Sequence, residues 1–431
     1  MQNTKPIIAT KTIAQTAKET SGIIALAGAE QKNAAIQFMT EKLVSRKRDI
    51  IAANLADVAE ATGKGLPTNM IDRLSFSEIK IEARVRALQK VKALPDPVGQ
   101  AYNLKHLPNG LDVMRMRVPL GVVLMIYEAR PHVTVNAGAL CLKSGNSAIL
   151  RGGSEARRCN ELLGVLWQES LTAVGLPRES IQVVSGSHDE IKALLQESEF
   201  IDLVIPRGGK TLIQAVIESS KIPVIKHYSG ICHVYIDCFA DIDKAIDISL
   251  DSKCLMPEVC NAMETLLVCK DLSSQVPKFV DAFKRCGVKV RGCRKIRNLI
   301  PNIESSTEED WRTEYLDNIV SMRIVTDVEE AIEHINSYGS HHTDAIVTNN
   351  VENADKFSQR VSSAVVLWNA STMFCDGESL GMGAEIGIST DKLHARGPMG
   401  LEELTSYKLF IRGDGHIMGD PHTYIKKAEK Y

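Results

Sequence analysis

Short apolar segments alternate with amphipathic segments through most of the chain, and this alternation constrains the fold more than any other feature. An apolar run at 121–127 is followed by Pro131, which suits the first turn of a helix. Further strands are predicted at 147–150, 181–184, 201–205, 232–237, 264–268, 319–325, 343–347 and 364–368, with helices at 154–174, 211–218, 276–285, 328–338 and 354–361. Strands separated by helices form parallel sheets covered on both faces. We expect an α/β fold, and 431 residues suffice for two or three domains.

The segments that flank this alternation have a different character. Apolar residues recur at helical spacing over 29–61 and 77–94, which predicts packing helices. Residues 104–118 instead alternate around an Asn-Gly turn, which is a hairpin signal, and their outward arginines are unlike those of a core strand. A final strand predicted at 406–412 also alternates and could pair with this hairpin. We expect a protruding hairpin that serves a homo-oligomer.

Composition argues against several classes of function. The net charge of -2 gives no electrostatic footprint for nucleic acid, and the 44% hydrophobic and 24% charged residues are those of a globular protein. The amino terminus lacks the apolar run of a secretory signal, and no membrane span is predicted. Ten cysteines without CxxC pairs favour reduced thiols in the cytoplasm, and they argue against disulfides and against a zinc site.

Two predicted strands end in glycine-rich turns that open a helix. One turn is Arg151-Gly152-Gly153-Ser154, and the other contains Arg207-Gly208-Gly209. Glycines let a backbone approach a phosphate, the helix amino terminus offers free N–H groups, and arginine supplies positive charge. Neither turn has the GxGxxG pattern of a dinucleotide fingerprint, so a phosphate site and a plain turn are both open. Nucleotides usually bind at the carboxyl ends of parallel strands, where both turns are expected to lie.

The thiol of Cys260 is the candidate nucleophile. It lies between a helix predicted at 241–251 and the strand at 264–268, and Pro257 cannot continue the helix. Short connections between rigid elements often present catalytic side chains, and a reactive thiol needs partial exposure near groups that favour thiolate. A buried structural cysteine is the alternative, because free cysteines are among the most buried residues.

Seven segments carry a family resemblance. They are PEVCNAMETLL around Cys260, ILRGGSEA, DLVIPRGG, GICHVYID, NASTMFCDG, GMGAEIGIS and KLHARGPMGLEELTSYK. Together they resemble the γ-glutamyl phosphate reductases of the aldehyde dehydrogenase superfamily, from the amino-terminal helices to about Gly415. The resemblance implies an aldehyde dehydrogenase-like fold. It has a Rossmann-type NADP-binding domain (1–104, 119–231 and 371–404), an αβα catalytic domain (232–370), and an oligomerisation β-hairpin and tail (105–118 and 405–431).

The resemblance also implies a reaction. Cys260 falls at the family's nucleophile position, whereas Cys254 is interpreted as packing. The thiolate would attack L-glutamyl 5-phosphate, release phosphate and hold a thioester, which NADPH reduces to L-glutamate 5-semialdehyde in proline biosynthesis. We expect a cytoplasmic homo-oligomer with a small-molecule substrate, and a glutamate 5-kinase is a candidate partner. Two alternatives stay open, an NAD(P)-dependent oxidising aldehyde dehydrogenase and an inactive cofactor-binding relative.

Two departures from oxidising aldehyde dehydrogenases favour the reductase. Their water-activating glutamate lies in a segment that corresponds here to His227-Tyr228-Ser229-Gly230-Ile231, which holds no carboxylate. Ser154 falls where many NAD enzymes of the superfamily place a ribose-binding glutamate, so it would not repel a 2′-phosphate, which Arg151 could bind. NADP is therefore favoured, although the adjacent Glu155 leaves another alignment open.

The resemblance assigns further site residues. Cofactor binding is expected of Arg151, Gly152, Gly153, Ser154, Arg207, Gly208, Gly209 and Glu385. Glu385 would hold the nicotinamide ribose, and a structural loop carboxylate is its alternative. Substrate contacts are expected of Arg130, Asn136, Lys253, Asn369, Ser371, Thr372, His394 and Arg396. Arginine and lysine suit the anionic ends of such a substrate, although a loop-stabilising role is equally open for each residue. No metal ligand is assigned.

Overall fold

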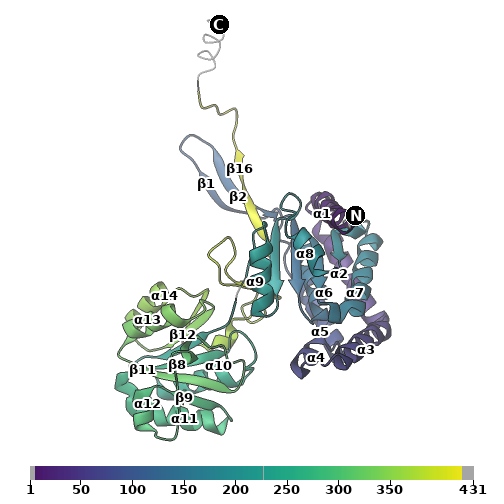
Figure 1. The fold of residues 1–431 in the computed structure, drawn as a ribbon. Coiled ribbons are helices and arrows are strands. Elements are labelled where there is room, and N and C mark those ends of the chain that lie inside the picture. Colours follow the sequence, from purple (N-terminus) through teal and green to yellow (C-terminus); the bar gives the residue numbers. More distant parts are fainter. Residues whose placement is uncertain (1–4, 227, 420–431) are drawn as a thin grey trace.

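The computed structural model describes residues 5–226 and 228–419. Two α/β lobes, each built on its own parallel sheet, lie beside one another, and a narrow antiparallel sheet projects away from them (Figure 1). The predicted α/β class is therefore confirmed. Among the described helices, none combines the length and the apolar character that crossing a membrane requires.

The amino-terminal lobe contains a four-stranded parallel sheet in the order β5-β4-β3-β6. The strands are β3 (Val122–Tyr127), β4 (Ser147–Gly152), β5 (Ile181–Val183) and β6 (Leu203–Arg207). One face is covered by α2 (Ala29–Ser45), α3 (Lys47–Gly63), α5 (Glu78–Ala93), α6 (Pro131–Lys143) and α7 (Arg157–Ala173), with α4 (Thr68–Leu74) beside α3. The other is covered by α1 (Lys5–Ile24), α8 (His188–Leu194) and α9 (Lys210–Ser219). Because both faces are covered, every residue of β3 is buried.

The second lobe contains a seven-stranded parallel sheet in the order β10-β9-β11-β8-β7-β12-β13. Its strands are β7 (Cys232–Ile236), β8 (Met263–Cys269), β9 (Lys289–Gly292), β10 (Glu304–Ser305), β11 (Ile319–Val325), β12 (Thr343–Val347) and β13 (Val365–Trp368). Helices α10 (Ile242–Cys254), α11 (Val276–Arg285) and α12 (Arg294–Leu299) pack on one face, and α13 (Val328–Tyr338) and α14 (Val351–Arg360) pack on the other.

The projecting sheet joins distant parts of the chain. It consists of β1 (Ala101–His106), β2 (Asp112–Pro119) and β16 (Thr405–Arg412), with β2 in the middle. The predicted pairing of the final strand with the early hairpin is confirmed, since β16 runs antiparallel to β2. The hairpin begins at Ala101 rather than at residue 105, so the predicted boundary moves back. Leu409 and Ile411 are more than half exposed, which leaves the predicted homo-oligomer role a prediction, and residues 420–431 of the predicted tail lie outside the described residues.

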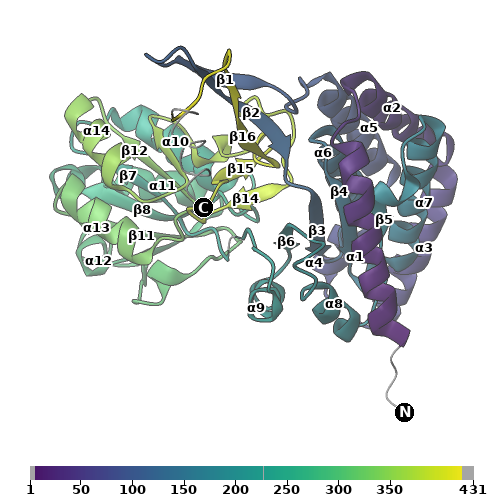
Figure 2. The same ribbon diagram turned by 90° about the horizontal axis from the view of Figure 1, so that it is seen from above.

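The chain crosses between the lobes after β13. A two-stranded ribbon of β14 (Gly387–Ser389) and β15 (Gly397–Met399) lies between the two lobes beneath the projecting sheet (Figure 2). Ile386 and Met399, at the edges of this ribbon, are buried in the core of the amino-terminal lobe. Part of the segment after β13 therefore packs with the first lobe, and the predicted domain division stays a prediction.

Some elements differ from the prediction. Arg46 separates α2 from α3, so the single helical pattern at 29–61 is two helices. Helix α10 continues to Cys254, which places that thiol in a helix rather than in the catalytic loop. Helix α1 and the strands β9 and β10 were not predicted. Both strands are short and partly exposed, so no apolar run marks them in the sequence.

Candidate active site

The Cys260 thiol lies in the turn between α10 and β8, as predicted, and it is partly buried. The next residue fixes this turn, because the Asn261 side-chain amide donates to the carbonyl oxygens of Thr372, Met373 and Cys375 at 3.2, 3.3 and 3.3 Å. The segment that leads from the second lobe back to the first therefore holds the thiol in place. Asn261 was not predicted as a site residue, since nothing in its local sequence indicates these partners.

A glycine and a buried carboxylate support Cys260 from behind. A Cβ atom at Gly230 would lie 1.7 Å from the Cys260 carbonyl oxygen, so only glycine fits there. The Gly230 N–H donates to Glu314 at 2.7 Å, and burial raises the pKa of Glu314. His227 lies outside the described residues. Residues 228–231, which follow His227, contain no acid, but the fold brings the Glu314 carboxylate against Gly230. The sequence comparison with oxidising aldehyde dehydrogenases did not predict this carboxylate.

Charges from both lobes act on the thiol. Burial raises the pKa of Cys260 to about 11, the Arg207 guanidinium opposes that rise, and the carboxylates of Glu385 and Glu314 add to it. The thiol is therefore protonated at neutral pH in this structure. Arg207 ends β6 of the first lobe, whereas Cys260 belongs to the second, so the reactive sulfur faces the boundary between them.

A cavity of about 460 Å³, lined by the first lobe and by the segment after β13, brings three predicted residues together, namely Asn136, Arg207 and Glu385. Burial raises the pKa of Glu385 to about 7 against the opposing effect of Arg207, and one carboxylate oxygen accepts the Gly377 N–H at 3.1 Å. The side-chain oxygen of Asn136 is buried without a hydrogen-bond partner. Such an oxygen is costly to leave unsatisfied and suits a ligand that donates a hydrogen bond.

A second cavity, of about 580 Å³, continues toward the catalytic loop. Both cavities are lined by Arg84 and His132, and the second also by Arg73, Lys80 and Glu258. Burial lowers the pKa of His132 to about 3, and the neighbouring Arg84 adds to this, so the imidazole is neutral at neutral pH. The predicted Arg130 adds to this positive charge. Burial lowers its pKa to about 10, and the charge of Arg207 contributes to the change. A surplus of positive charge suits an anionic substrate. Sequence reasoning identified Arg130 but not Arg73, Lys80 or Arg84.

The first glycine-rich turn lines a separate cavity of about 210 Å³ at the ends of β4 and β5. A Cβ at Gly152 would lie 2.0 Å from the Asn160 amide nitrogen, so the turn has no space for a side chain. The Arg151 Nε atom is buried without a partner, and Ser154 is exposed. The Glu155 carboxylate lies against Gly153, where a Cβ would be 2.0 Å from its Oε1 atom, and that oxygen accepts the Ala129 N–H at 2.6 Å. An open glycine turn with an unsatisfied arginine fits a phosphate-bearing cofactor.

The second glycine-rich turn is already filled. Glu128 places a carboxylate oxygen 2.9 Å from the Gly209 N–H at the start of α9, and a Cβ at Gly208 would collide with the same carboxylate. The carboxylate occupies one of the N–H groups at this helix amino terminus and places a negative charge where a phosphate would bind. Of this turn Arg207 alone lines the main cavity, and the predicted cofactor role of Gly208 and Gly209 stays a prediction.

Lys253 does not reach the cavities. Its side chain is fully buried and pairs with the equally buried Glu264 at 2.7 Å. Burial raises the pKa of Glu264 to about 7, which the ammonium group opposes. In this structure Lys253 forms an internal ion pair instead of the predicted substrate contact. It precedes the nucleophile by seven residues.

The other predicted substrate residues make contacts within the chain. Ser371 and the Thr372 N–H bind the Ser252 hydroxyl, each at 3.1 Å. The remaining contacts join Asn369 to the Thr348 backbone, His394 to the Glu403 carbonyl and Arg396 to the Ser362 carbonyl. These bonds order the segment that also holds Asn261. The loop-stabilising alternative accounts for them without a ligand.

Known proteins with the same architecture are similar over nearly the whole chain. The model of the aldehyde dehydrogenase family matches residues 4–292. A γ-glutamyl phosphate reductase of Desulforapulum autotrophicum is 48% identical over 405 residues, which are 94% of this chain and 97% of that protein.

Solved structures give the same result. A γ-glutamyl phosphate reductase from Thermotoga maritima superposes with a TM-score of 0.92 at 38% identity, over 96% of this chain and all of that chain. The reductase of the same name from Saccharomyces cerevisiae has a TM-score of 0.54 at 32% identity, over 96% of this chain and 99% of that one. An acetylating aldehyde dehydrogenase from Geobacillus thermoglucosidasius shares the fold, with a TM-score of 0.69 at 16% identity, over 97% of this chain and 100% of that chain. The chain therefore belongs to the aldehyde dehydrogenase family, among its γ-glutamyl phosphate reductases.

Proposed function

We propose that this chain reduces L-glutamyl 5-phosphate to L-glutamate 5-semialdehyde and phosphate, the reductive step of proline biosynthesis. The observation that carries the proposal is the position of Cys260, a fixed and partly buried thiol on which the charges of Arg207 and Glu385 act, two residues that line one cavity with Asn136. The relatives with the highest similarity given above carry the name of this reaction.

The first step is attack of the Cys260 sulfur on the acyl carbon of the substrate. A carbon–sulfur bond forms, the bond between that carbon and the phosphate oxygen breaks, and the thiol proton leaves with the released hydrogen phosphate. The pKa of the thiol is raised to about 11, so little thiolate exists before the reaction. The sulfur therefore attacks the activated acyl group while its proton passes to the leaving phosphate. Arg207 favours the developing thiolate.

The resulting thioester is reduced in the second step. NADPH, when bound, supplies the hydride. The Cys260 backbone N–H lies against its own sulfur, where it can donate to the oxyanion that develops on the thioester carbonyl. Asn261 cannot serve as this donor, since its amide is occupied by three carbonyl groups, and it acts instead by positioning the turn. Collapse of the thiohemiacetal returns the thiol and releases the semialdehyde.

The cofactor would be held by residues of two cavities, the one at the first glycine-rich turn and the one that Arg207 lines. Arg151, Gly152, Gly153 and Ser154 would bind its phosphate groups, and Glu385 and Asn136 would bind nearer the nicotinamide. The exposed Ser154, the unpartnered Arg151 nitrogen and the nearby Arg157 favour NADP, and the Glu155 carboxylate is engaged by the Ala129 N–H. The basic side chains of the second cavity, with Arg130, would bind the anionic ends of the substrate.

The assembly and the setting of the reaction are also proposals. The exposed apolar side chains of β16 support a homo-oligomer built through the projecting sheet. The labile acyl phosphate gives a glutamate 5-kinase a reason to act nearby as a partner, and ten cysteines without a CxxC pair fit a cytoplasmic location.

The reverse reaction tests the proposal. Purified protein is given glutamate 5-semialdehyde and NADP, and NADPH absorbance is followed with and without inorganic phosphate, in the wild type and in Cys260→Ser. We expect NADPH to form only with phosphate and not in the variant. Turnover without phosphate would instead support an oxidising aldehyde dehydrogenase, and a protein that binds NADP without turnover would be an inactive relative.

A further inference from the structure

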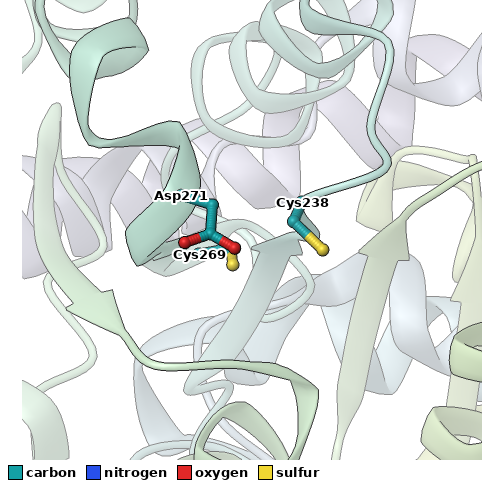
Figure 3. Close-up of side chains that lie close together, drawn as sticks. All are labelled: Cys238, Cys269 and Asp271. Carbon is teal, nitrogen blue, oxygen red and sulfur yellow. The ribbon is translucent and has the colours of Figure 1, made fainter.

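Three side chains of metal-binding type meet at the end of the second sheet that is remote from Cys260. Among the residues that the structure describes, the sulfur atoms of Cys238 and Cys269 and a carboxylate oxygen of Asp271 all lie within 4.8 Å of one another. Cys269 is the last residue of β8, Cys238 follows the neighbouring β7, and Asp271 lies in the turn after β8 (Figure 3). Cys260 precedes β8, so the two thiol sites lie at opposite ends of this strand.

The donor set has a definite preference among metals. Thiolate ligands select soft or borderline ions, and two thiolates with a carboxylate suit Zn²⁺ better than Mg²⁺ or Ca²⁺, which prefer oxygen ligands. Sulfur atoms bound to one tetrahedral zinc lie about 3.8 Å apart, as follows from Zn–S bonds of about 2.3 Å. Small side-chain rotations therefore suffice to bring the three donors to a common ion.

The surroundings of the three donors allow them to serve a metal. The two thiols are hydrogen-bonded to each other, and their other contacts are long, from Cys238 to Asp237 at 3.8 Å and from Cys269 to the Thr326 carbonyl at 3.6 Å. Asp237 is held by the hydroxyl groups of Tyr235 and Thr348 and by the Asn353 amide, which leaves the carboxylate of Asp271 as the more adaptable one. Cys269 is buried, Cys238 is partly buried and Asp271 is exposed, so an ion can enter from solvent.

We propose that Cys238, Cys269 and Asp271 bind one Zn²⁺ ion, with solvent water as the fourth ligand. Binding converts two thiols to thiolates and releases two protons to solvent. The ion joins the ends of β7 and β8 to the turn after β8, and because the unfolded chain has no such site, it stabilises the folded lobe. The sequence argued against zinc because it has no CxxC pair, but these ligands come from two neighbouring strands, and no spacing rule along the chain reveals them.

The experiment measures metal binding directly and does not depend on activity. The full chain is reduced, freed of metal with a chelator and titrated with Co²⁺, whose thiolate complexes absorb strongly in the near ultraviolet. Zn²⁺ then displaces the cobalt in competition with a chelating dye, which gives the stoichiometry and the affinity. We expect one ion per chain, a thiolate-to-cobalt absorption band, and a melting temperature that rises with added Zn²⁺.

Variants assign the site. Cys238→Ala and Asp271→Asn should each weaken Zn²⁺ binding by at least about tenfold. Asp271 is exposed, so Asp271→Asn leaves the fold intact even if a change at the buried Cys269 does not. Two controls remove thiols elsewhere, namely the catalytic Cys260→Ser and the double variant Cys254→Ser/Cys286→Ser, which removes another hydrogen-bonded pair of thiols. Both should bind Zn²⁺ as the wild type does.

Two results would overturn the assignment. A cobalt band that persists in Cys238→Ala and Asp271→Asn but disappears in Cys260→Ser would place the ion on the catalytic thiol. Absence of both the absorption band and the rise in melting temperature, in a chain whose thiols are fully reduced, would show that the three donors bind no such ion.

Discussion

The two glycine-rich turns of the first lobe have nearly the same sequence but different environments. In Arg151-Gly152-Gly153-Ser154 the turn lines an open cavity and one arginine nitrogen has no partner. In the turn after β6, the Glu128 carboxylate fills the corresponding position and binds the Gly209 N–H. Both turns have an acid packed against a glycine, but Glu155 accepts the Ala129 N–H, whereas Glu128 accepts an N–H of its own turn, that of Gly209.

The comparison assigns different roles to the two arginines. Arg151 lies at a cavity that suits a phosphate group, whereas Arg207 lines the cavity near the thiol and acts on the charge of Cys260. A glycine turn after a strand therefore indicates a phosphate site only when no protein carboxylate already binds the N–H groups of the following helix. Variants at each turn test whether the two arginines have different roles.

Arg207→Ala should have the largest effect. Removing the guanidinium raises the barrier to thiolate formation, so we expect kcat/KM to fall by about 100-fold with little change in KM for NADPH. Steady-state kinetics in the reductive direction would measure it. Arg151→Ala is the matched control, and it should raise KM for NADPH instead. If both variants act mainly on KM for NADPH, the two arginines share one role.

The glycines give the next largest contrast. Gly152→Ala places a Cβ atom 2.0 Å from the buried Asn160 amide, and we expect it to lower the free energy of unfolding by about 1–3 kcal/mol. At Gly209 the nearest atom is a carboxylate oxygen at 3.9 Å and φ is -69°, so Gly209→Ala should cost less than about 1 kcal/mol. Urea unfolding monitored by circular dichroism distinguishes them. Equal losses would mean that packing at the two turns is alike.

The cofactor choice tests the open turn. Ser154→Glu introduces a carboxylate where we place the 2′-phosphate, and it should raise KM for NADPH by about tenfold while that for NADH changes little. A carboxylate at the second turn, in Lys210→Glu, should leave the preference between the two cofactors unchanged. If the preference shifts only in Lys210→Glu, the 2′-phosphate binds at the second turn and our placement of it at Ser154 is wrong.

The carboxylate beside Arg207 gives the smallest effect. Burial raises the pKa of Glu385 from 4.5 to about 7, so the folded chain holds this proton more tightly than the unfolded chain. Its contribution to stability is full below pH 4.5 and is lost as the pH rises toward 7. The full shift would correspond to about 3 kcal/mol, but solvent screens this partly exposed side chain, so we expect Glu385→Gln to gain about 1 kcal/mol relative to the wild type by pH 7, in chemical denaturation at several pH values. The exposed Glu378→Gln should show no such gain, and an equal gain there would contradict the assignment.

Sequence patterns predicted the regular part of the fold well. Strands β11 and β12 and helix α13 have the predicted bounds, because each combines a clear apolar period with turn residues at both ends. Strand β9 pairs with β11 through its backbone and has an exposed first residue, so its own four residues give no period from which to predict it.

The candidate site was predictable only where a single segment carries it. The position of Cys260 followed from Pro257 and from the strand after it, and the first glycine turn followed from its sequence. The contact of Gly230 with Glu314 spans 84 residues, and the filling of the second turn by Glu128 spans 81. Both depend on which elements the tertiary fold brings together. Local periodicity carries no information about such partners.

Alkylation of Cys260 tests the two arginine roles most directly. The rate of its reaction with iodoacetamide is followed by peptide mass spectrometry across pH in the wild type, Arg207→Ala and Arg151→Ala. We predict a wild-type pKa well above that of an ordinary cysteine, a slower reaction and a higher pKa in Arg207→Ala, and no change in Arg151→Ala. A profile that Arg151→Ala shifts as much as Arg207→Ala, or that neither variant shifts, would contradict the account.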